Sequence, residues 1–472
     1  MMQVYLGNDI KVINPDPSLV AWAEKYLTVR NAEYDKRSRL GYSTYKCPEN
    51  VSFYQEQGGA TNKILILPYG TWSYIGETVL KIAPVYDTII DHGEIDYGNI
   101  DMGLYDYQEK AIEGMTRNTN GILIGPCGAG KTQIGIGIVV ALKRKALWIT
   151  HTNDLLEQSY ERAARYMPKE WIGKICGGKV DIGSHLTVAT VQTLSRMDLY
   201  QYRDMWDVVI VDECHRVCGN VDKIQMFYKV VSNLSAKYKY GLTATLHRSD
   251  GMEASVYAVL GRIAYRIPDN AVASRVITPS VKIRFTETPE SMSYCDRFGE
   301  PQFSPLIGYL ASDFQRNQMI VRDMMSPVNR GHSSLILSDR LTHLKTLMSM
   351  LPEEEQEKCV MIDGSMQSKK GKEKRQQAIQ DMQEGRRKYL FASYGLAKEG
   401  LDIQCLDRLY MASPKSDYTV VKQSLGRISR KSPGKSSAIC YDYVDARIGM
   451  LYKGLYRKRA DIYIRMGLKM FV

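Results

Sequence analysis

The residues best suited to chemistry lie in an eight-residue stretch, GPCGAGKT, that matches the phosphate-binding pattern G-x-x-x-x-G-K-[ST]. Glycines let backbone N–H groups turn toward phosphate oxygens, and the N-terminus of a following helix adds partial positive charge. The Lys131 ammonium can reach the β- and γ-phosphates, and the Thr132 hydroxyl can ligate Mg²⁺. The stretch therefore predicts a site for a nucleoside triphosphate, formed by Gly125, Pro126, Cys127, Gly128, Ala129, Gly130, Lys131 and Thr132.

The segments on both sides of this stretch fit the same interpretation. Residues 121–124 (GILI) predict a short buried strand that enters the loop, and residues 133–143 predict an apolar helix that leaves it. By composition alone, a chain of this length should contain the pattern about 0.02 times by chance. The flanking strand and helix make a chance match rarer still.

Two adjacent carboxylates, Asp212 and Glu213, follow a continuous apolar segment at residues 207–211. Such a segment is typical of a parallel strand covered on both faces, which would deliver the pair to its carboxyl end. There Asp212 can hold Mg²⁺ through water, and Glu213 can orient or deprotonate an attacking water. A lone Asp-Glu pair is most often a solvated turn, but the upstream phosphate loop favours the catalytic interpretation.

Three further side chains are candidates for the same site. Gln108 lies 17 residues before Gly125, and its carboxamide can donate and accept at once, as N6 and N7 of adenine require. Arg427 and Arg430 are predicted on one face of a helix that begins near residue 420. Either they form surface salt bridges, or they complete an ATP site from across an interdomain cleft, as arginine fingers do.

Composition sets broader limits on the protein. Its 472 residues predict two or three domains, and 44% hydrophobic and 24% charged residues are typical of a soluble globular chain. The net charge of +11 favours a polyanionic partner. The nine cysteines include no C-x-x-C pair, which predicts reduced thiols and no metal or iron–sulfur site. The longest apolar run, residues 134–142, is too short for a bilayer, and no targeting segment is recognised, so we expect a cytoplasmic protein without a membrane partner.

The order of predicted elements indicates an α/β fold. Strands at residues 145–150, 186–189, 207–211 and 240–246 alternate with helices and imply a doubly wound parallel sheet. A second α/β pattern has strands at residues 333–337, 359–362 and 389–392. The proline-containing residues 268–316 predict a linker and an edge strand at 281–285.

Residues 1 to about 100 predict a small α+β module, with a helix at 19–32 and a strand at 63–68. One alternative is that this module shields the first sheet, and the other is that it contacts duplex DNA. The second is weakly favoured by a group of basic and aromatic residues: Lys36, Arg37, Arg39, Tyr42 and Tyr45.

Residues 104–431 resemble the superfamily 2 helicases. The resemblance rests on ordered motifs: Gln108, GPCGAGKT, HTNDLLEQ (151–158), TVQTL (190–194), DECH (212–215), TAT (243–245), LAKEGLDI (396–403) and QSLGRISR (423–430). The segments GLTATLHRSDG, EGLDI and QSLGRISR are most similar to the XPB-like and phage UvsW-like branch. The resemblance implies two RecA-like doubly wound domains in tandem, at residues 101–274 and 275–472, after an N-terminal DNA-contact domain at 1–100.

The resemblance also implies roles for individual residues. Lys131 and Thr132 would bind phosphate and Mg²⁺, Asp212 and Glu213 would support hydrolysis, and Arg427 and Arg430 would reach the γ-phosphate. Gly400 and Asp402 would belong to the nucleotide site and couple the two domains, and the HTNDLLEQ, TVQTL and YGLAKEG segments would touch the nucleic-acid backbone. Three departures stand out, and none removes a catalytic group: His151 in place of proline, Cys214 in place of alanine, and Ser393-Tyr394 in place of a threonine-containing pair.

From these features we expect an ATP-dependent DNA helicase or translocase that uses ATP and Mg²⁺. It would unwind, branch-migrate or remodel duplex, forked or branched DNA in replication, recombination or repair, with little sequence preference. The alternatives are the motor subunit of a restriction system, an RNA helicase, and a non-enzymatic binding module. The chain shows no convincing nuclease motif, so cleavage would need a partner, and the intact Lys131, Asp212 and Glu213 argue against the non-enzymatic module.

Overall fold

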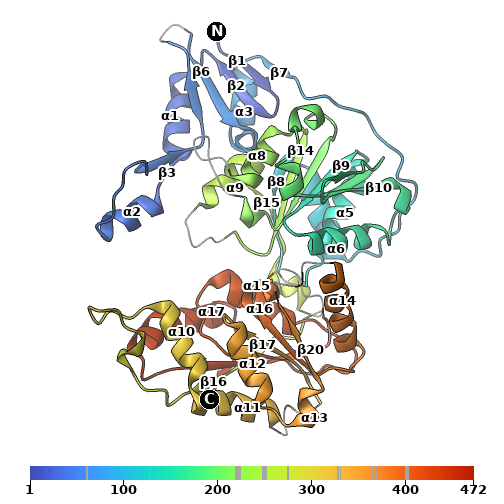
Figure 1. Ribbon diagram of the computed structural model, residues 1–472. Coiled ribbons are helices and arrows are strands. Elements are labelled where there is room, and N and C mark those ends of the chain that lie inside the picture. The colour runs from blue at the N-terminus through green and yellow to red at the C-terminus, as the bar shows by residue number, and fades with distance from the viewer. Residues whose placement is uncertain are drawn as a thin grey trace. The chain divides into compact units, whose positions relative to one another are not determined.

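The computed structural model describes the chain in two compact units, Met1–Ala271 and Val272–Val472 (Figure 1). It leaves undescribed residues 60–61, 127, 218–224, 247–251, 274–275, 327–328, 330, 364–365, 367–368 and 399–402, and the side chains of 369, 370, 372, 397 and 398. Three predicted site residues, Cys127, Gly400 and Asp402, therefore lie outside the described residues. Among the helices that are described, none has the length and apolarity needed to cross a membrane.

The first unit begins with a five-stranded sheet in the order β5-β6-β2-β1-β7. Its inner face is apolar because alternate residues of β1 and β2 point inward, with Val4, Ile10 and Val12 fully buried. The elements are β1 (Gln3–Leu6), β2 (Asp9–Ile13), α1 (Pro17–Tyr26), β5 (Gln55–Gln57), β6 (Ile64–Pro68), α3 (Trp72–Ile82) and β7 (Val85–Asp87).

An arm extends from this sheet (Figure 1) and consists of β3 (Thr28–Arg30), α2 (Ala32–Arg39) and β4 (Asn50–Ser52). The predicted helix at residues 19–32 is shorter in the structure, because the chain turns after Tyr26 into β3, which pairs with β4. No residue of α2 is buried. The arm is thus presented to solvent on both faces of its helix.

The small sheet and the larger sheet of this unit are packed together through Gly70. The side chain of Asn120 donates a hydrogen bond to the Gly70 carbonyl at 3.1 Å. A Cβ atom on Gly70 would lie 2.5 Å from the backbone nitrogen of Gly261, so only glycine permits this approach. The N-terminal module therefore covers part of the larger sheet, while its arm stays exposed.

The larger sheet of the first unit has eight strands in the order β11-β10-β12-β9-β13-β14-β8-β15. Every pair is parallel except β10 with β11, and every residue of β8, β9, β12 and β13 is buried, as predicted for strands covered on both faces. The strands are β8 (Asn120–Ile124), β9 (Ala146–Thr150), β10 (Ile172–Cys176), β11 (Lys179–Val180), β12 (Leu186–Thr190), β13 (Val208–Asp212), β14 (Tyr238–Thr243) and β15 (Ile263–Arg266). The helices are α4 (Asp106–Thr116), α5 (Lys131–Leu142), α6 (Asn153–Ala163), α7 (Val191–Leu194), α8 (Met226–Asn233) and α9 (Glu253–Leu260).

The second unit has a parallel sheet of seven strands in the order β18-β19-β17-β20-β21-β16-β22. The strands are β16 (Ser280–Phe285), β17 (Ser333–Ser338), β18 (Cys359–Ile362), β19 (Tyr389–Ser393), β20 (Leu406–Met411), β21 (Ile439–Val444) and β22 (Met470–Phe471). The helices are α10 (Phe303–Ser312), α11 (Phe314–Met325), α12 (Leu341–Ser349), α13 (Glu353–Gln356), α14 (Lys369–Gln383), α15 (Tyr394–Lys398), α16 (Tyr418–Ile428) and α17 (Arg457–Arg465). The predicted fold of two doubly wound, RecA-like domains with a small α+β module is confirmed.

One prediction for this unit is wrong. Residues 281–285 were expected to form an edge strand, yet β16 lies between β21 and β22, and residues 268–316 also contain α10 and the start of α11. The short strand β22, at the end of the chain, pairs with β16 and covers its outer side. A two-residue strand so distant in sequence leaves no local pattern that predicts this pairing.

Candidate nucleotide and nucleic-acid site

The phosphate loop lies between β8 and α5, as predicted. The Gly125 N–H donates to the Thr243 carbonyl at 3.0 Å, which ties the start of the loop to the end of β14. Gly128 and Gly130 have φ angles of 86° and 72°, a region that glycine adopts without strain. Lys131 is the first residue of α5, and its ammonium folds back to 3.3 Å from the Gly125 carbonyl. The ammonium is thus held over the loop where phosphates would bind.

Gln108 is buried beside this loop. Its carboxamide oxygen accepts from the Tyr105 N–H at 3.1 Å, and its nitrogen donates to the Ala129 carbonyl at 3.2 Å. The same side chain thus caps α4 and supports the loop, a structural role that the sequence analysis missed. A Cβ atom on Gly130 would lie only 2.5 Å from the carboxamide nitrogen, so the close approach needs glycine.

The carboxylate pair stands at the carboxyl end of β13. Asp212 is buried and accepts a hydrogen bond from the Glu213 N–H at 3.0 Å. Glu213 has a φ of 50°, an uncommon left-handed conformation for a residue other than glycine. Strain of this kind persists where the surroundings enforce it, and functional sites are such places.

The pKa values of the two carboxylates are shifted in opposite directions. Burial and the charge of Glu213 raise the pKa of Asp212, only partly offset by Lys131. Burial also opposes ionisation of Glu213, but the hydrogen bond from His215 and the charge of Lys131 outweigh it and lower the pKa of Glu213. Glu213 is therefore ionised at neutral pH and can orient a water molecule by accepting its hydrogen bond, and Asp212 is a buried acid that a divalent cation would stabilise as the carboxylate.

His215 connects this pair to the next strand. Its Nδ1 lies 3.1 Å from the Thr243 hydroxyl and 3.2 Å from a carboxylate oxygen of Glu213. The Thr243 hydroxyl donates to the Thr245 carbonyl at 2.7 Å, so the single Nδ1–H of the imidazole is shared between the Thr243 hydroxyl and the Glu213 carboxylate. His215 is not among the site residues predicted from the sequence, although its place in the DECH segment was the available signal.

The two segments expected at the nucleic-acid backbone in this unit lie side by side. They follow β9 and β12, which are adjacent parallel strands with Thr150 opposite Thr190. The Thr152 hydroxyl accepts from the Leu155 N–H at 3.3 Å and caps α6, and the Gln192 side chain donates to the His151 carbonyl at 2.6 Å. These contacts fix two helix N-termini at the carboxyl ends of β9 and β12, an arrangement suited to phosphate groups.

In the second unit, the arginine segment, residues 423–430 (QSLGRISR), begins on α16. The helix begins after Asp417, whose carboxylate accepts from the Val420 N–H at 2.9 Å, and it ends at Ile428. Arg427 lies in its last turn, whereas Arg430 lies beyond the helix and forms an isolated antiparallel bridge with Val276. The prediction that both arginines share one helical face is therefore wrong.

The cause is a backbone contact from a distant part of the chain. The Ile277 N–H donates to the Ser429 carbonyl at 2.7 Å, so the chain after α16 pairs with the segment that opens this unit instead of continuing the helix. Both arginines are half-buried.

In the nearby YGLAKEG segment, the Tyr394 hydroxyl donates to the Ser413 carbonyl at 2.7 Å.

Comparisons with known proteins agree with this arrangement. Residues 101–248 match the family described as "Type III restriction enzyme, res subunit", and residues 317–432 match the "Helicase conserved C-terminal domain". Together the two matches cover more than half of the chain and include the phosphate loop, the carboxylate pair and the arginine segment.

Several curated proteins are similar in sequence. A candidate ATP-dependent RNA helicase of Acanthamoeba polyphaga mimivirus is 27% identical over 71% of this chain and 62% of its own length. The DNA 3'-5' helicase XPB of Mycobacterium tuberculosis is 29% identical over 42% of this chain and 38% of its own length. The ATP-dependent DNA helicase uvsW of Enterobacteria phage T4 is 22% identical over 81% of this chain and 76% of its own length. The chain thus spans less than two thirds of the first two relatives.

Solved structures share the fold. A fragment of an HsdR-type subunit of a type I restriction enzyme from Vibrio vulnificus has a TM-score of 0.54 at 16% identity, covering 93% of this chain and 80% of that chain. The type ISP restriction-modification enzyme LlaBIII, bound to DNA, has a TM-score of 0.52 at 18% identity over 78% of this chain and 30% of that chain. With its ordered motifs and its two matched families, the chain belongs to the superfamily 2 helicases, and it is similar in sequence to XPB and phage UvsW proteins.

Proposed function

We propose that this protein is a DNA translocase that hydrolyses ATP to move along duplex, forked or branched DNA and to unwind or remodel it. The observation that carries the proposal is Glu213, a carboxylate kept ionised in a left-handed backbone conformation at the end of β13. Such a carboxylate can orient and deprotonate the water that attacks the γ-phosphate. In the same unit, Lys131 lies at the first position of α5, where its charge would neutralise the phosphates.

Mg²⁺ is part of this proposal. The Thr132 hydroxyl and, through water, the Asp212 carboxylate would hold the ion, and a buried acid at the end of a parallel strand suits that task. When bound, the ion would neutralise charge on the β- and γ-phosphates. The loop residues Gly125 to Thr132 would cradle the triphosphate, and Gln108 would contact adenine with the hydrogen-bonding capacity that its backbone contacts leave.

The second unit would supply the remaining charges. Arg427 and Arg430 are proposed to reach the γ-phosphate when ATP draws the two units together, and Gly400 and Asp402 are proposed to couple the units. Hydrolysis would release this grip. Alternating contacts with the nucleic-acid backbone would then convert turnover into stepping.

The arm of the N-terminal module is proposed to contact duplex DNA. Its helix α2 and the following turn carry Lys36, Arg37 and Arg39 beside Tyr42 and Tyr45, which are 66% and 80% exposed. Cations and exposed aromatic rings without a base-reading motif suit sequence-independent contact with the phosphate backbone. The net charge of +11 favours the same partner.

DNA is preferred to RNA because the XPB and uvsW relatives are described as DNA helicases, although the mimivirus relative is described as an RNA helicase. A second candidate function is the motor of a restriction system, favoured by the fold shared with two restriction enzymes. The proposed location is the cytoplasm, or the host cytoplasm if a phage encodes the protein.

One experiment separates these functions: steady-state ATPase activity with single-stranded DNA, duplex, fork, four-way junction and RNA. The proposal expects the strongest stimulation by duplex or branched DNA. Stimulation by RNA alone would favour the RNA helicase, and a nuclease subunit that co-purifies with the protein would favour the restriction motor. Absence of stimulation by any nucleic acid would contradict all three.

A further inference from the structure

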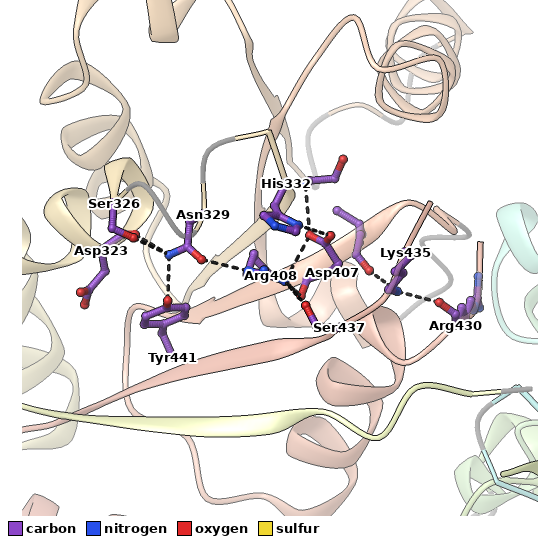
Figure 2. Close-up of polar contacts among 12 residues, drawn as sticks. Asp323, Ser326, Asn329, His332, Asp407, Arg408, Arg430, Lys435, Ser437 and Tyr441 are labelled. Carbon is purple, nitrogen blue, oxygen red and sulfur yellow. Dashed lines mark hydrogen bonds and ion pairs between the residues drawn. The ribbon is translucent and has the colours of Figure 1, made fainter. Parts of the chain in front are cut away.

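Lys435 lies in the loop between α16 and β21, and its side chain turns inward. Its ammonium donates to the Arg430 carbonyl at 2.6 Å and to the Leu406 carbonyl at 2.5 Å (Figure 2). The residues on either side, Gly434 and Ser436, are exposed, whereas Lys435 is half-buried. Burial lowers the pKa of Lys435 to about 8, partly offset by Asp407. A half-buried ammonium that donates to two backbone carbonyls joins two specific segments, whereas most lysine side chains extend into solvent.

One end of this link is fixed. Leu406 opens β20, and the next residue, Asp407, accepts from the Ser333 N–H at 3.1 Å and lies 2.5 Å from His332 Nδ1. Arg408 follows; it is buried and donates to the Asn329 side chain at 2.9 Å. Figure 2 shows these contacts continuing through Asn329 to Tyr441, which lies on β21. The start of β20 is therefore a rigid support within the second unit.

The other end of the link is the arginine segment. Arg430 pairs with Val276, and Ser429 accepts from the Ile277 N–H at 2.7 Å. The second unit begins at Val272, so residues 276 and 277 belong to the stretch through which the chain enters this unit. The backbone of Arg430 is thus bonded on one side to the entering chain and on the other, through Lys435, to β20.

We propose that Lys435 is a positioning residue that holds the backbone of Arg430 against β20 and so sets where the Arg427 and Arg430 guanidinium groups stand. The inference rests on the proposed γ-phosphate role of those arginines. The entering chain is bonded to Ser429 and Arg430, so a change in its path would move the arginine segment. The bonds of Lys435 hold that segment at a fixed distance from β20. Loss of the link would misplace the arginines without touching the phosphate loop of the first unit.

The test replaces Lys435 and measures steady-state ATPase with duplex DNA. Lys435→Met keeps the apolar stem and removes the donors, so DNA-stimulated kcat should fall by about 10²-fold, the cost of a misplacement of about 1 Å. The KM for ATP should change by less than about threefold, since the first unit is proposed to make most of the contacts that bind ATP. Lys435→Arg, which restores two donors, should recover most of the activity.

Two controls make the result specific. Lys358→Met removes an ammonium that pairs with Glu355 at the surface of the same unit, and it should leave kcat at the parental value. The pair of changes Arg427→Ala and Arg430→Ala should lower kcat by itself, and adding Lys435→Met to that background should cause little further loss, because Lys435 is proposed to act through those two side chains. A further loss of the full 10²-fold would overturn the inference, since Lys435 would then act elsewhere.

If Lys435→Met does not fold, a backbone variant tests the same segment. Ile277→Pro removes the N–H that bonds Ser429, whereas Ile277→Ala keeps it. DNA-stimulated turnover should fall in the proline variant and not in the alanine variant, and equal turnover would overturn the inference. A parental protein without nucleic-acid stimulation would instead overturn the proposed function, so the two failures are distinguishable. Full turnover of a folded Lys435→Met protein would overturn the inference alone.

Discussion

The imidazole Nδ1 of His215 lies 3.1 Å from the Thr243 hydroxyl, so the segment after β13 is joined to the last residue of β14. These strands are parallel neighbours, with Asp212 opposite Leu242. The same imidazole lies 3.2 Å from the Glu213 carboxylate. A movement of the TAT segment would therefore act on the carboxylate proposed to activate water.

The first prediction concerns this link. Thr243→Val removes the hydroxyl but keeps the shape of the side chain, and a lost buried hydrogen bond costs about 1–3 kcal/mol. DNA-stimulated turnover should fall about tenfold while nucleotide affinity is kept, measured by steady-state ATPase beside nucleotide binding. Thr243→Ser keeps the hydroxyl and serves as the control. Equal turnover in both variants would show that the link has no part in hydrolysis.

The second prediction concerns the phosphate loop. Gly130→Ala would place a Cβ atom 2.5 Å from the Gln108 carboxamide, at a φ of 72° that alanine adopts only with strain. It should lower both the melting temperature and ATP affinity. Gly177→Ala is a matched control, since Gly177 has a φ of 58° and nothing within 4 Å of an added Cβ. Gly177→Ala should lose about 1 kcal/mol of stability and keep its ATP affinity. Equal ATP affinity in Gly130→Ala and Gly177→Ala would argue against a steric role for the contact between Gly130 and Gln108.

The third prediction concerns pH. Burial lowers the pKa of Lys239 to about 7, with Arg203 adding to the effect and Asp9 opposing it. Its ammonium lies 3.3 Å from the Val231 carbonyl and 4.7 Å from the ring of Tyr69. Between about pH 7 and 10 the unfolded chain keeps this proton and the folded chain releases it, so folding stability should rise with pH across that window.

Lys239→Met should remove this rise and should stabilise the protein most near pH 6, where the native fold must bury the charge. The measurement is the free energy of unfolding from denaturant titration at several pH values. Lys237→Met changes a half-buried lysine two residues away, and its stability should follow the parental pH profile. An unchanged slope for Lys239→Met would contradict the prediction.

The fourth prediction concerns the arm. Binding to duplex DNA should weaken with salt, and each phosphate contact contributes about −0.9 to the slope of log affinity against log salt. Lys36→Ala and Arg39→Ala, on exposed α2, should each make that slope shallower by about 0.9 and weaken binding to all sequences alike. Lys358→Ala, in the second unit, is the control of equal charge. A salt slope unaffected by the arm variants would place the DNA contact elsewhere.

The strands around the nucleotide site could be predicted because their residues are continuously apolar. The segments ending at Ile124, Thr150 and Asp212 are buried on both faces, so composition alone marks them. The glycines of the phosphate loop could be predicted equally well, since few other residues adopt φ angles of 72° and 86°.

Contacts between distant segments could not be predicted in this way. The helical pattern near Arg427 continues through Arg430, but a hydrogen bond from Ile277 to Ser429 ends the helix, and no local feature reports that partner. The contact by which Gln108 supports the phosphate loop could not be predicted for the same reason, because its partner, Ala129, lies 21 residues away. Side-chain links of this kind depend on the assembled sheet.

The central claim is that Glu213 activates water for ATP hydrolysis driven by contact with DNA. The most direct measurement is the steady-state ATPase rate of Glu213→Gln and of the parental protein, each with and without duplex DNA. The amide is nearly isosteric but cannot take a proton, so the variant should bind ATP with parental affinity and lose about 10²–10⁴-fold of the DNA-stimulated rate. Hydrolysis by Glu213→Gln at the parental DNA-stimulated rate would contradict the account.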